Sequence, residues 1–195
     1  MGPPFLFVAR SPTAVGMKAL ALIAAILLAA PSSPAKQPHL SSVYTSIAPH
    51  HCKTVRDSKD SQAERDVLQR CPGYAGIPLF VEDFDARTTV SAGSPDGESC
   101  LVSRGCGFTS AGDRVEWRLA NGKPFAIIYR LTSDYTDDSG KDMHEPFLIV
   151  ETLKDKNRPA CRIAEIPGRK PNANALARSA ADQVLAGGVK CLRVH

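Results

Sequence analysis

The stretch that decides the fold runs from residue 115 to residue 131 and reads VEWRLANGKPFAIIYRL. From Val115 to Leu119, apolar residues alternate with charged ones, which is typical of a strand with one buried face. Asn121-Gly122 then gives a strong signal for a tight hairpin turn. Apolar residues resume at every second position from 125 to 131, so the stretch predicts two strands joined by that turn.

Further strand patterns lie on both sides of this hairpin. Residues 77–82 and 88–90 are β-prone before it, and residues 147–153, 161–166 and 191–194 are β-prone after it. This succession of short runs predicts an antiparallel meander.

One segment near the C-terminus breaks the strand pattern. Its apolar residues recur at helical spacing and are Ala173, Leu176, Ala177, Ala180 and Val184. Asn172 or Asn174 can serve as the N-cap, and Gly187-Gly188 supplies the stop. Arg178 and Asp182 are four residues apart on the polar side. The sequence therefore predicts an α+β fold, an antiparallel β-sheet meander with one C-terminal helix packed on a face.

Two stretches carry no clear strand pattern. Residues 43–71 contain few apolar positions, and within them residues 62–68 favour one or two helical turns. Residues 91–113 contain many glycines and are predicted to be a loop.

The chain contains six cysteines, an even number. All of them follow the N-terminal apolar segment, and such a set in an exported chain indicates three disulfides. Six cysteines allow 15 connectivities. Neighbour order favours the pairs Cys52–Cys71, Cys100–Cys106 and Cys161–Cys191.

The N-terminal segment has the pattern of an export signal. Lys18 precedes an apolar run of 12 residues, 19–30, which ends at Pro31. A membrane-spanning helix needs about 20 apolar residues, so the run fits the core of a signal peptide instead. Ser33 and Ala35 suit the −3 and −1 positions of a cleavage site. An uncleaved membrane anchor is the alternative.

The export signal divides the chain into three expected parts. Met17 is a second candidate for the first residue of the protein. We expect a signal peptide over 1–35, a flexible arm over 36–42 and a single disulfide-stabilised domain over 43–195. The predicted location is the periplasm or the outside of the cell, with no membrane contact after cleavage.

The net charge is small. The chain has 24 Lys and Arg against 20 Asp and Glu, a net charge of +4, and removing Arg10 and Lys18 with the signal leaves +2. Nucleic-acid binding calls for a larger, clustered basic excess, so no nucleic-acid partner is expected.

Two segments resemble a known group of proteins. These are Arg70-Cys71-Pro72-Gly73-Tyr74-Ala75-Gly76-Ile77-Pro78, and Asn174-Ala175-Leu176-Ala177-Arg178 with Ala181-Asp182, followed by Cys191. Together they resemble small secreted proteins of proteobacteria to which no function is assigned. The resemblance implies export and the disulfide set, and it carries no catalytic residue across.

An acidic segment is the metal candidate. Oxygen-bearing residues at the spacing of a calcium loop are Asp134, Thr136, Asp138, Asp142 and Glu145. Ser139 stands where such a loop needs glycine, and Lys141 adds a positive charge. The alternative is a solvated hairpin loop, and we expect neither a bound metal nor a cofactor.

Signals for catalysis are few. No nucleophile elbow, zinc-protease motif or phosphate loop is present. His50, His51 and His144 are candidate ligands for Zn²⁺ or Cu²⁺, with surface histidines as the alternative. Cys106 with His144 as base would be a nucleophilic pair, but the even cysteine count favours a disulfide.

Two further groups have a functional and a structural interpretation. Glu82, Asp83 and Asp85 could supply a carboxylate pair for acid–base hydrolysis, or be solvated at a strand end. Arg70, Tyr74 and Phe80 resemble the centre of a contact patch, or the two aromatic residues pack the sheet.

These observations favour a non-enzymatic exported binding module. The expected partner is an envelope protein, such as a wall-degrading enzyme to be inhibited, or an envelope glycan, and the expected contacts are residues 91–113 and 132–146. The alternatives are a secreted hydrolase of unrecognised family, using His144 or a carboxylate, and a Ca²⁺-stabilised envelope module. The ligand and the oligomeric state do not follow from the sequence.

Overall fold

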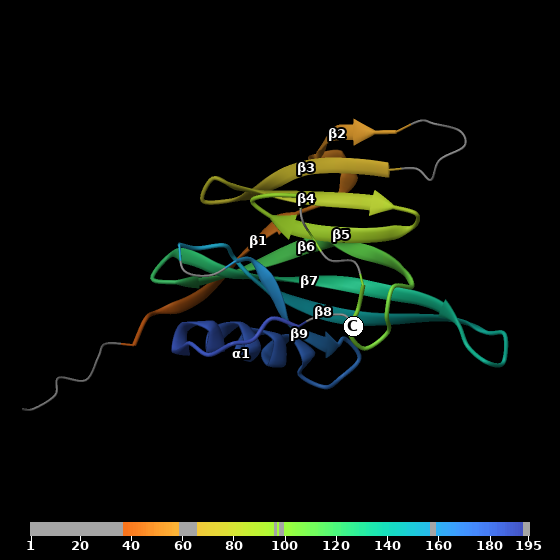
Figure 1. The fold of residues 1–195 in the computed structure, drawn as a ribbon. Coiled ribbons are helices and arrows are strands. Elements are labelled where there is room, and N and C mark those ends of the chain that lie inside the picture. Colours follow the sequence, from red (N-terminus) through yellow and green to blue (C-terminus); the bar gives the residue numbers. More distant parts are fainter. Residues whose placement is uncertain (1–36, 59–65, 96, 98–99, 157–158, 193–195) are drawn as a thin grey trace, which may run out of the picture. The chain divides into compact units, whose positions relative to one another are not determined.

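The computed structural model describes residues 37–58, 66–95, 97, 100–156 and 159–192. Strands dominate this part of the chain, with one α-helix near its C-terminal end (Figure 1). The elements are β1 (Leu40–Ser46), a short 3₁₀ helix (Pro49–His51), β2 (Lys53–Asp57), β3 (Asp66–Tyr74), β4 (Ile77–Phe84), β5 (Arg87–Ala92), β6 (Phe108–Ala120), β7 (Lys123–Thr136), β8 (Asp142–Thr152), β9 (Cys161–Pro167) and α1 (Ala173–Ala186).

Strand β6 is where the sheet branches. The sheet runs in chain order from β2 to β9, and β1 adds to it by pairing with β6. All neighbours are antiparallel except β5 and β6, which meet only at Arg87 and Thr109 in a parallel bridge. The meander prediction is therefore confirmed within β2–β5 and within β6–β9, with a break between them.

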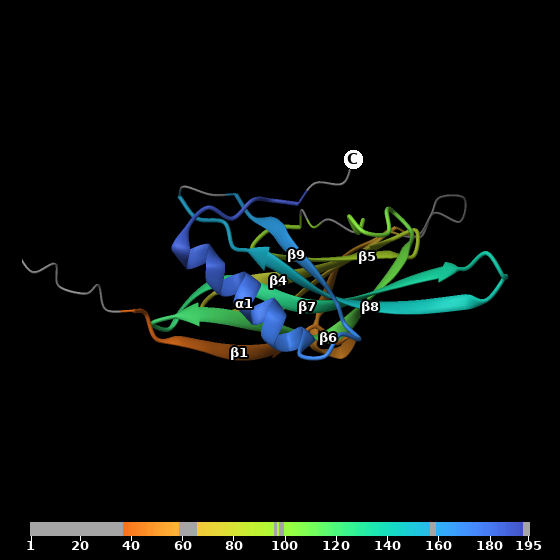
Figure 2. The ribbon, with the colours of Figure 1, turned by 90° about the horizontal axis from the view of Figure 1, so that it is seen from below.

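The predicted central hairpin forms as β6 and β7. Ala120 pairs with Lys123 across the turn, and Asn121 and Gly122 have φ angles of 51° and 80°. Positive φ at both central residues is what a type I′ turn requires, which explains the choice of Asn-Gly. Strands β7 and β8 pair over eleven positions. The end of this hairpin that carries the turn from β7 to β8 projects from the rest of the domain (Figure 2).

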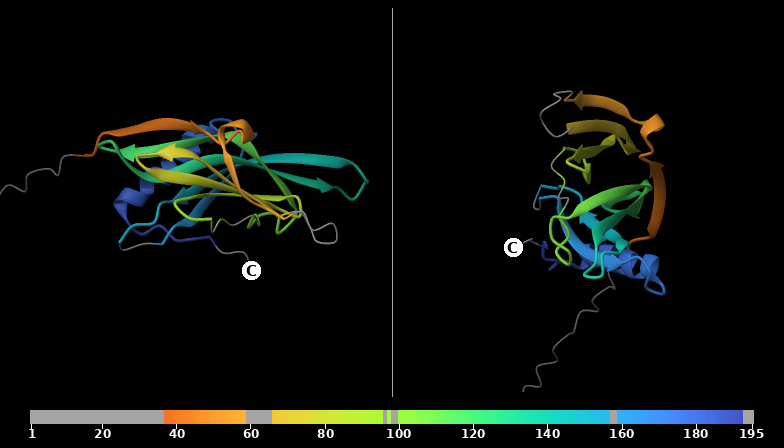
Figure 3. Two further views of the ribbon diagram at one scale, coloured as in Figure 1. Left: turned by 90° about the horizontal axis from the view of Figure 1, so that it is seen from above. Right: turned by 90° about the vertical axis from the view of Figure 1, so that its right-hand side faces the viewer.

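The strands β6–β8 carry a hydrophobic layer on each face. On one face, Trp117, Ile127 and Ile149 pack with Leu79 and Val90 of the β3–β5 half. On the other face, α1 covers β7, β8 and β9 (Figures 1 and 2). This arrangement agrees with the prediction of one C-terminal helix packed on a face of the sheet. Figure 3 shows β2 and β3 at one end of the domain and α1 at the other.

The helix prediction is confirmed in its bounds and corrected in its apolar face. The residues of α1 that are buried are Ala173, Ala177, Ala181 and Val184. Leu176 is 44 % exposed, since it lies outside the face that the three alanines and Val184 pack against the sheet. Asn172 sits at the N-cap in the left-handed region (φ 62°) and makes no side-chain capping bond. Gly187 ends the helix as predicted, with its N–H bonded to the Val184 carbonyl.

All three predicted disulfides form. They join Cys52 to Cys71, Cys100 to Cys106 and Cys161 to Cys191, so no cysteine is free. The first joins the start of β2 to β3, and the third joins β9 to the segment after α1.

Three predictions for the first half were wrong. The segment 62–68 is not helical where it is described, since β3 begins at Asp66 and pairs on both edges with β2 and β4. Strand β1 begins at Leu40 and so takes in the end of the predicted flexible arm, 36–42. The predicted loop 91–113 is shorter, because β5 reaches Ala92 and β6 begins at Phe108.

Two predictions for the second half also need correction. Residues 132–146 are mostly strand, and only the turn between Thr136 and Asp142 is loop. The terminal strand 191–194 is absent at Cys191 and Leu192, where one hydrogen bond, from Leu192 N–H to the Arg162 carbonyl, replaces a ladder (2.8 Å). Residues 193–194 lie outside the described residues.

The predicted signal peptide, 1–35, also lies outside the described residues. In the part of the chain that is described, no helix has the length and hydropathy to cross a membrane.

Candidate functional site

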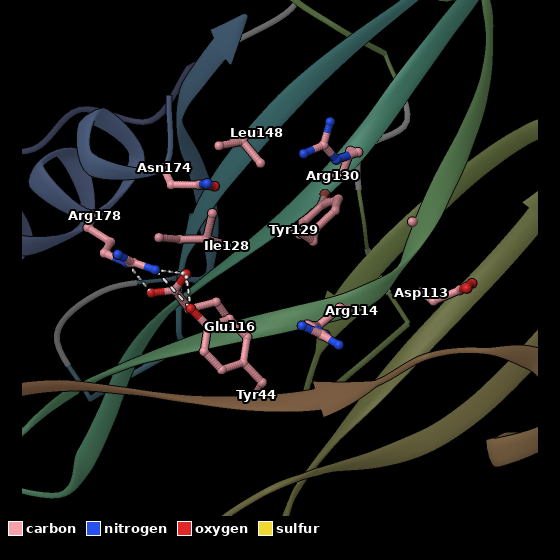
Figure 4. Close-up of a pocket in the computed structure, with 11 residues that line it drawn as sticks. Tyr44, Asp113, Arg114, Glu116, Ile128, Tyr129, Arg130, Leu148, Asn174 and Arg178 are labelled. Carbon is pink, nitrogen blue, oxygen red and sulfur yellow. Dashed lines mark hydrogen bonds and ion pairs between the residues drawn. The ribbon is translucent and has the colours of Figure 1, made fainter. Parts of the chain in front are cut away.

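A pocket of about 330 Å³ opens beside the first turns of α1, on the sheet face that the helix covers (Figure 4). Strands β1, β6, β7 and β8 form its floor and α1 forms one wall. It is lined by Tyr44, Gly112, Asp113, Arg114, Glu116, Ile128, Tyr129, Arg130, Leu148, Asn174 and Arg178. Three arginines against two carboxylates make this lining basic.

Glu116 is the fixed point of the pocket. Its side chain rises from β6 toward α1 and is only 7 % exposed. One carboxylate oxygen accepts from Ser42 Oγ (2.6 Å) and Arg178 Nε (2.6 Å), and the other accepts from Tyr44 Oη (3.1 Å) and a terminal nitrogen of Arg178 (3.2 Å). Four donors therefore occupy both oxygens, and β1, β6 and α1 meet at this one group.

These contacts set the charge state of Glu116. Burial raises the pKa of a carboxyl group, but the hydrogen bonds from Arg178 and Ser42 favour the charged form more strongly. The net result is a pKa of Glu116 below its ordinary value of 4.5. The same pairing raises the pKa of Arg178. The pair is therefore a charged Glu–Arg pair at neutral pH.

A second ion pair fixes the helix farther along β6. Arg118 donates three hydrogen bonds to the Asp182 carboxylate of α1, one from Nε (3.0 Å) and two from a terminal nitrogen (2.7 and 2.8 Å). Its other terminal nitrogen donates to Ser42 Oγ of β1 (2.7 Å). Planar pairing of this kind holds both position and orientation. The two pairs together attach α1 to the sheet through charges as well as through alanine packing.

Arg114 and Arg130 behave differently from the other arginines of this face. Both are exposed at the pocket, and neither has a carboxylate partner within the described residues. The Arg114 guanidinium lies 5.8 Å from the centre of the Tyr44 ring. Arg130 comes from β7 on the other side of the floor (Figure 4). The pocket thus presents two cations that the protein itself does not neutralise.

Gly112 explains how β6 passes under Arg130. The β6–β7 register shifts between Ala111 and Val115, so Gly112 lies in a bulge. A Cβ at Gly112 would lie 3.3 Å from the Arg130 Cβ, closer than ordinary contact. Glycine therefore permits the close approach that brings Arg114 and Arg130 to the same pocket.

The start of α1 adds to the positive potential of the pocket. Asn174, in its first turn, lines the pocket, and the free N–H groups of a first turn carry partial positive charge. No acidic residue occupies this turn. The two unpaired arginines remain the main source of charge, and the helix end supports them.

The predicted contact patch is divided between two environments. Arg70 and Phe80 pair across β3 and β4 and share one face. Tyr74 packs against the buried core, with its ring 6.2 Å from that of Trp117. The patch of three therefore reduces to Arg70 and Phe80.

The predicted calcium ligands are not brought together. Asp134 bonds His144 Nδ1 (2.6 Å), Glu145 pairs with Arg104, and the Asp142 carboxylate accepts from Thr136 Oγ1 (3.1 Å). Asp138 lies in the turn beyond them. Within the described residues no group of three His, Cys, Asp or Glu side chains could hold a metal ion.

The remaining candidates are also separated. His50 and His51 are neighbours in the 3₁₀ helix, with rings 4.0 Å apart, and lie on a different element from His144. Glu82 pairs with Arg56 and Asp85 with Arg87. Cys106 is held in its disulfide. No nucleophile with a nearby base emerges from these residues.

A second cluster of charged side chains lies in the core and was not predicted. Tyr129 Oη donates to Glu151 (2.7 Å), and Arg162 lies 3.6 Å from the same oxygen and 3.0 Å from Glu165. Burial, followed by the charge of Glu151, raises the pKa of Tyr129 well above its ordinary value. Tyr129 is 2 % exposed, and its hydroxyl stays neutral.

The buried cluster positions the Cys100–Cys106 loop. Arg162 donates to the Cys100 carbonyl (2.6 Å), and Glu165 accepts from the N–H groups of Val102 (2.9 Å) and Ser103 (3.3 Å). The cluster therefore holds this loop in place through its backbone groups.

A signal for the pocket was present in the sequence but was interpreted differently. Glu116 and Arg118 are two residues apart on β6, and Arg178 and Asp182 are four apart on α1. The sequence placed Arg178 and Asp182 together on the polar side of the helix, and in the structure each pairs with a residue of β6. Opposite charges in matching order on a strand and on a helix are the pattern that would have revealed the contact.

Comparisons with protein-family models, with curated proteins and with solved structures find no match for this chain. A proposal for the function therefore rests on the geometry of the pocket.

Proposed function

We propose that this protein is a non-enzymatic binding module whose pocket beside α1 holds an acidic group of a partner. The observation that carries this proposal is the pair Arg114 and Arg130, two exposed cations facing one pocket without carboxylate partners among the described residues. Guanidinium groups recognise carboxylate and phosphate through paired hydrogen bonds. Tyr44 offers an aromatic surface beside them.

The fixed lining of the pocket supports binding over catalysis. An acid or base in a hydrolase must exchange a proton, and it needs a free oxygen and a pKa near the working pH. Glu116 has four donors on its two oxygens and a lowered pKa. It can hold the pocket in shape, but it has no oxygen left for a substrate.

The rigidity of the domain supports the same proposal. The Glu116–Arg178 and Arg118–Asp182 pairs fix α1 against β6 before any ligand arrives, and three disulfides brace other parts of the domain. A preformed site loses less conformational entropy on binding. Disulfides persist in oxidising compartments, so we propose a partner in the cell envelope.

The proposal is tested by titrating the protein with inorganic phosphate and, separately, with acetate. Binding is monitored through the Nε–Hε NMR signals of the arginines. We expect Arg114 and Arg130 to shift together, with phosphate binding more tightly than acetate because it carries more charge. The double variant R114Q/R130Q should weaken phosphate binding about tenfold or more.

A matched control keeps this test specific. Arg56 is an exposed arginine on β2 that is already paired with Asp66 and Glu82. R56Q should leave phosphate binding within about twofold of the wild type. Equal losses in R56Q and R114Q/R130Q would mean that general charge, and not the pocket, attracts the anion, and the proposal would fail.

A further inference from the structure

A second cavity, of about 350 Å³, opens at the branch point of the sheet. Its walls come from the β3–β5 half on one side and from the end of β1 on the other, with β6 residues 110–113 between them. It shares Gly112 and Asp113 with the arginine pocket, so the bulge of β6 separates the two. Its location makes the edge of β6 accessible.

That edge of β6 lacks a strand partner for a short distance. β5 pairs with β6 only at Thr109, and β1 pairs with it from Arg114 onward. Ile47 extends the β1 side by one hydrogen bond to Asp113, so among the described residues nothing pairs with 110–112 on this edge. At about 3.3 Å per residue, the gap is about 10 Å long, enough for a strand of about three residues.

The backbone groups facing the gap follow from alternation along the strand. Thr109 N–H donates to the Ala86 carbonyl (3.0 Å), and the Asp113 carbonyl accepts from Ile47 N–H (2.9 Å). Alternate residues of a strand direct both backbone groups to the same edge. Ala111 lies between these two, so its N–H and carbonyl face the gap.

The side chains around the gap give it a chemical preference. Ile47, Val67 and Val81 provide apolar walls. Asp83 and Asp113 also line the cavity, and no Lys, Arg or His does. Neither carboxylate has a hydrogen bond or ion pair within the described residues. Unpaired carboxylates beside an open strand edge suit a positively charged peptide.

We propose that this cavity binds an extended basic peptide. The peptide backbone would pair with Ala111 as a short added strand, and a Lys or Arg side chain would reach Asp83 and Asp113. Backbone pairing supplies affinity in such complexes and the side-chain pocket supplies selectivity. This site adjoins the arginine pocket, with which it shares Gly112 and Asp113, but it includes neither Arg114 nor Arg130 and does not depend on the function proposed for them.

The test is an NMR titration of the protein with three capped peptides. These are acetyl-Val-Lys-Val-amide, its Glu counterpart, and the Lys peptide with N-methylated backbone amides. We expect the amide of Ala111 to shift with the first peptide and affinity to fall about tenfold with the Glu peptide. N-methylation should weaken binding by a similar factor, because it removes the donors of the added strand.

Protein variants separate the two halves of the proposal. D83N removes one carboxylate at an exposed position and should weaken the Lys peptide about threefold. D138N, an exposed carboxylate in the β7–β8 turn, is the matched control and should leave it unchanged. R114Q/R130Q should also leave it unchanged, which distinguishes this site from the anion pocket. Equal affinity for the Lys and Glu peptides, or no shift in 110–113, would overturn the proposal.

Discussion

The two faces of strand β7 each carry a cluster of arginine and glutamate, and the clusters differ in what they leave free. On one face, Tyr129, Glu151 and Arg162 are buried and contact one another and the Cys100–Cys106 loop. On the other, Glu116 and Arg178 are paired but lie beside Arg114 and Arg130, which are not. The two faces therefore differ in unpaired charge at an open surface, and the proposed function depends on that difference.

The largest effect should come from the closed cluster. R162M should lower the free energy of unfolding by about 3 to 5 kcal/mol, because Glu151 and Glu165 would remain buried without their cation. Urea unfolding monitored by the fluorescence of Trp117 measures this loss. If R162M unfolds at the same urea concentration as the wild type, the cluster does not stabilise the fold. The two faces would then not differ in their contribution to stability.

The disulfide beside that cluster should have the next largest effect. Replacing Cys100 and Cys106 by serine should cost about 2 kcal/mol, the loop-closure value for so short a loop. Arg162 and Glu165 hold the same loop through its backbone, so the fold should survive. Thermal unfolding with and without reductant checks the value. A fully unfolded double-serine variant would show that the disulfide, and not the charged cluster, positions the loop.

The open face should respond to pH through Glu116. Its folded pKa lies below the ordinary value of 4.5, so its stabilising effect is complete above that value and is lost as the pH falls through the folded pKa. E116Q should therefore cost about 1 to 2 kcal/mol at pH 7 and much less at the acidic end of the range. Unfolding curves of both proteins from pH 7 to pH 3 test this.

Two features make the Glu116 prediction specific. D182N removes the partner of Arg118 on the same helix and should show a smaller loss, since Asp182 is the more exposed carboxylate. A cost for E116Q that stays constant from pH 7 to pH 3 would contradict the assignment of the lowered pKa to this group.

The fold followed from the sequence wherever a local signal was strong. Asn121-Gly122 between alternating strands predicted the central hairpin, and the alanine stripe predicted α1. Strands β1 and β2 were missed because their apolar positions are few, and β1 forms only by pairing with β6, more than 70 residues away, as the bond from Ser42 to Glu116 illustrates. Long-range pairing of this kind leaves no short-range pattern to detect.

The candidate site was also harder to predict from the sequence, because its residues lie far apart in the chain. Glu116 and Arg178 are 62 residues apart, and Tyr44 and Arg178 are 134 apart. Alternation predicts an exposed side chain at Glu116, and helical spacing places Arg178 on the polar side of its helix. Tyr44 lies in a stretch without a clear strand pattern. The disulfides were predictable because an oxidising compartment and an even count constrain cysteines, and no comparable rule constrains arginines.

The smallest effect on stability should accompany the largest effect on binding. Arg130 is exposed and has no carboxylate partner among the described residues, so R130Q should change the free energy of unfolding by less than about 0.5 kcal/mol. The same change should reduce phosphate affinity severalfold, whereas R162M should reduce stability without changing the charge at the pocket surface. A side chain that stabilises nothing in its own chain but is needed for an anion is one whose partner lies outside the molecule. If R130Q destabilised the fold as much as E116Q, Arg130 would be part of the network that stabilises the fold. The charges on both faces of β7 would then serve stability alone.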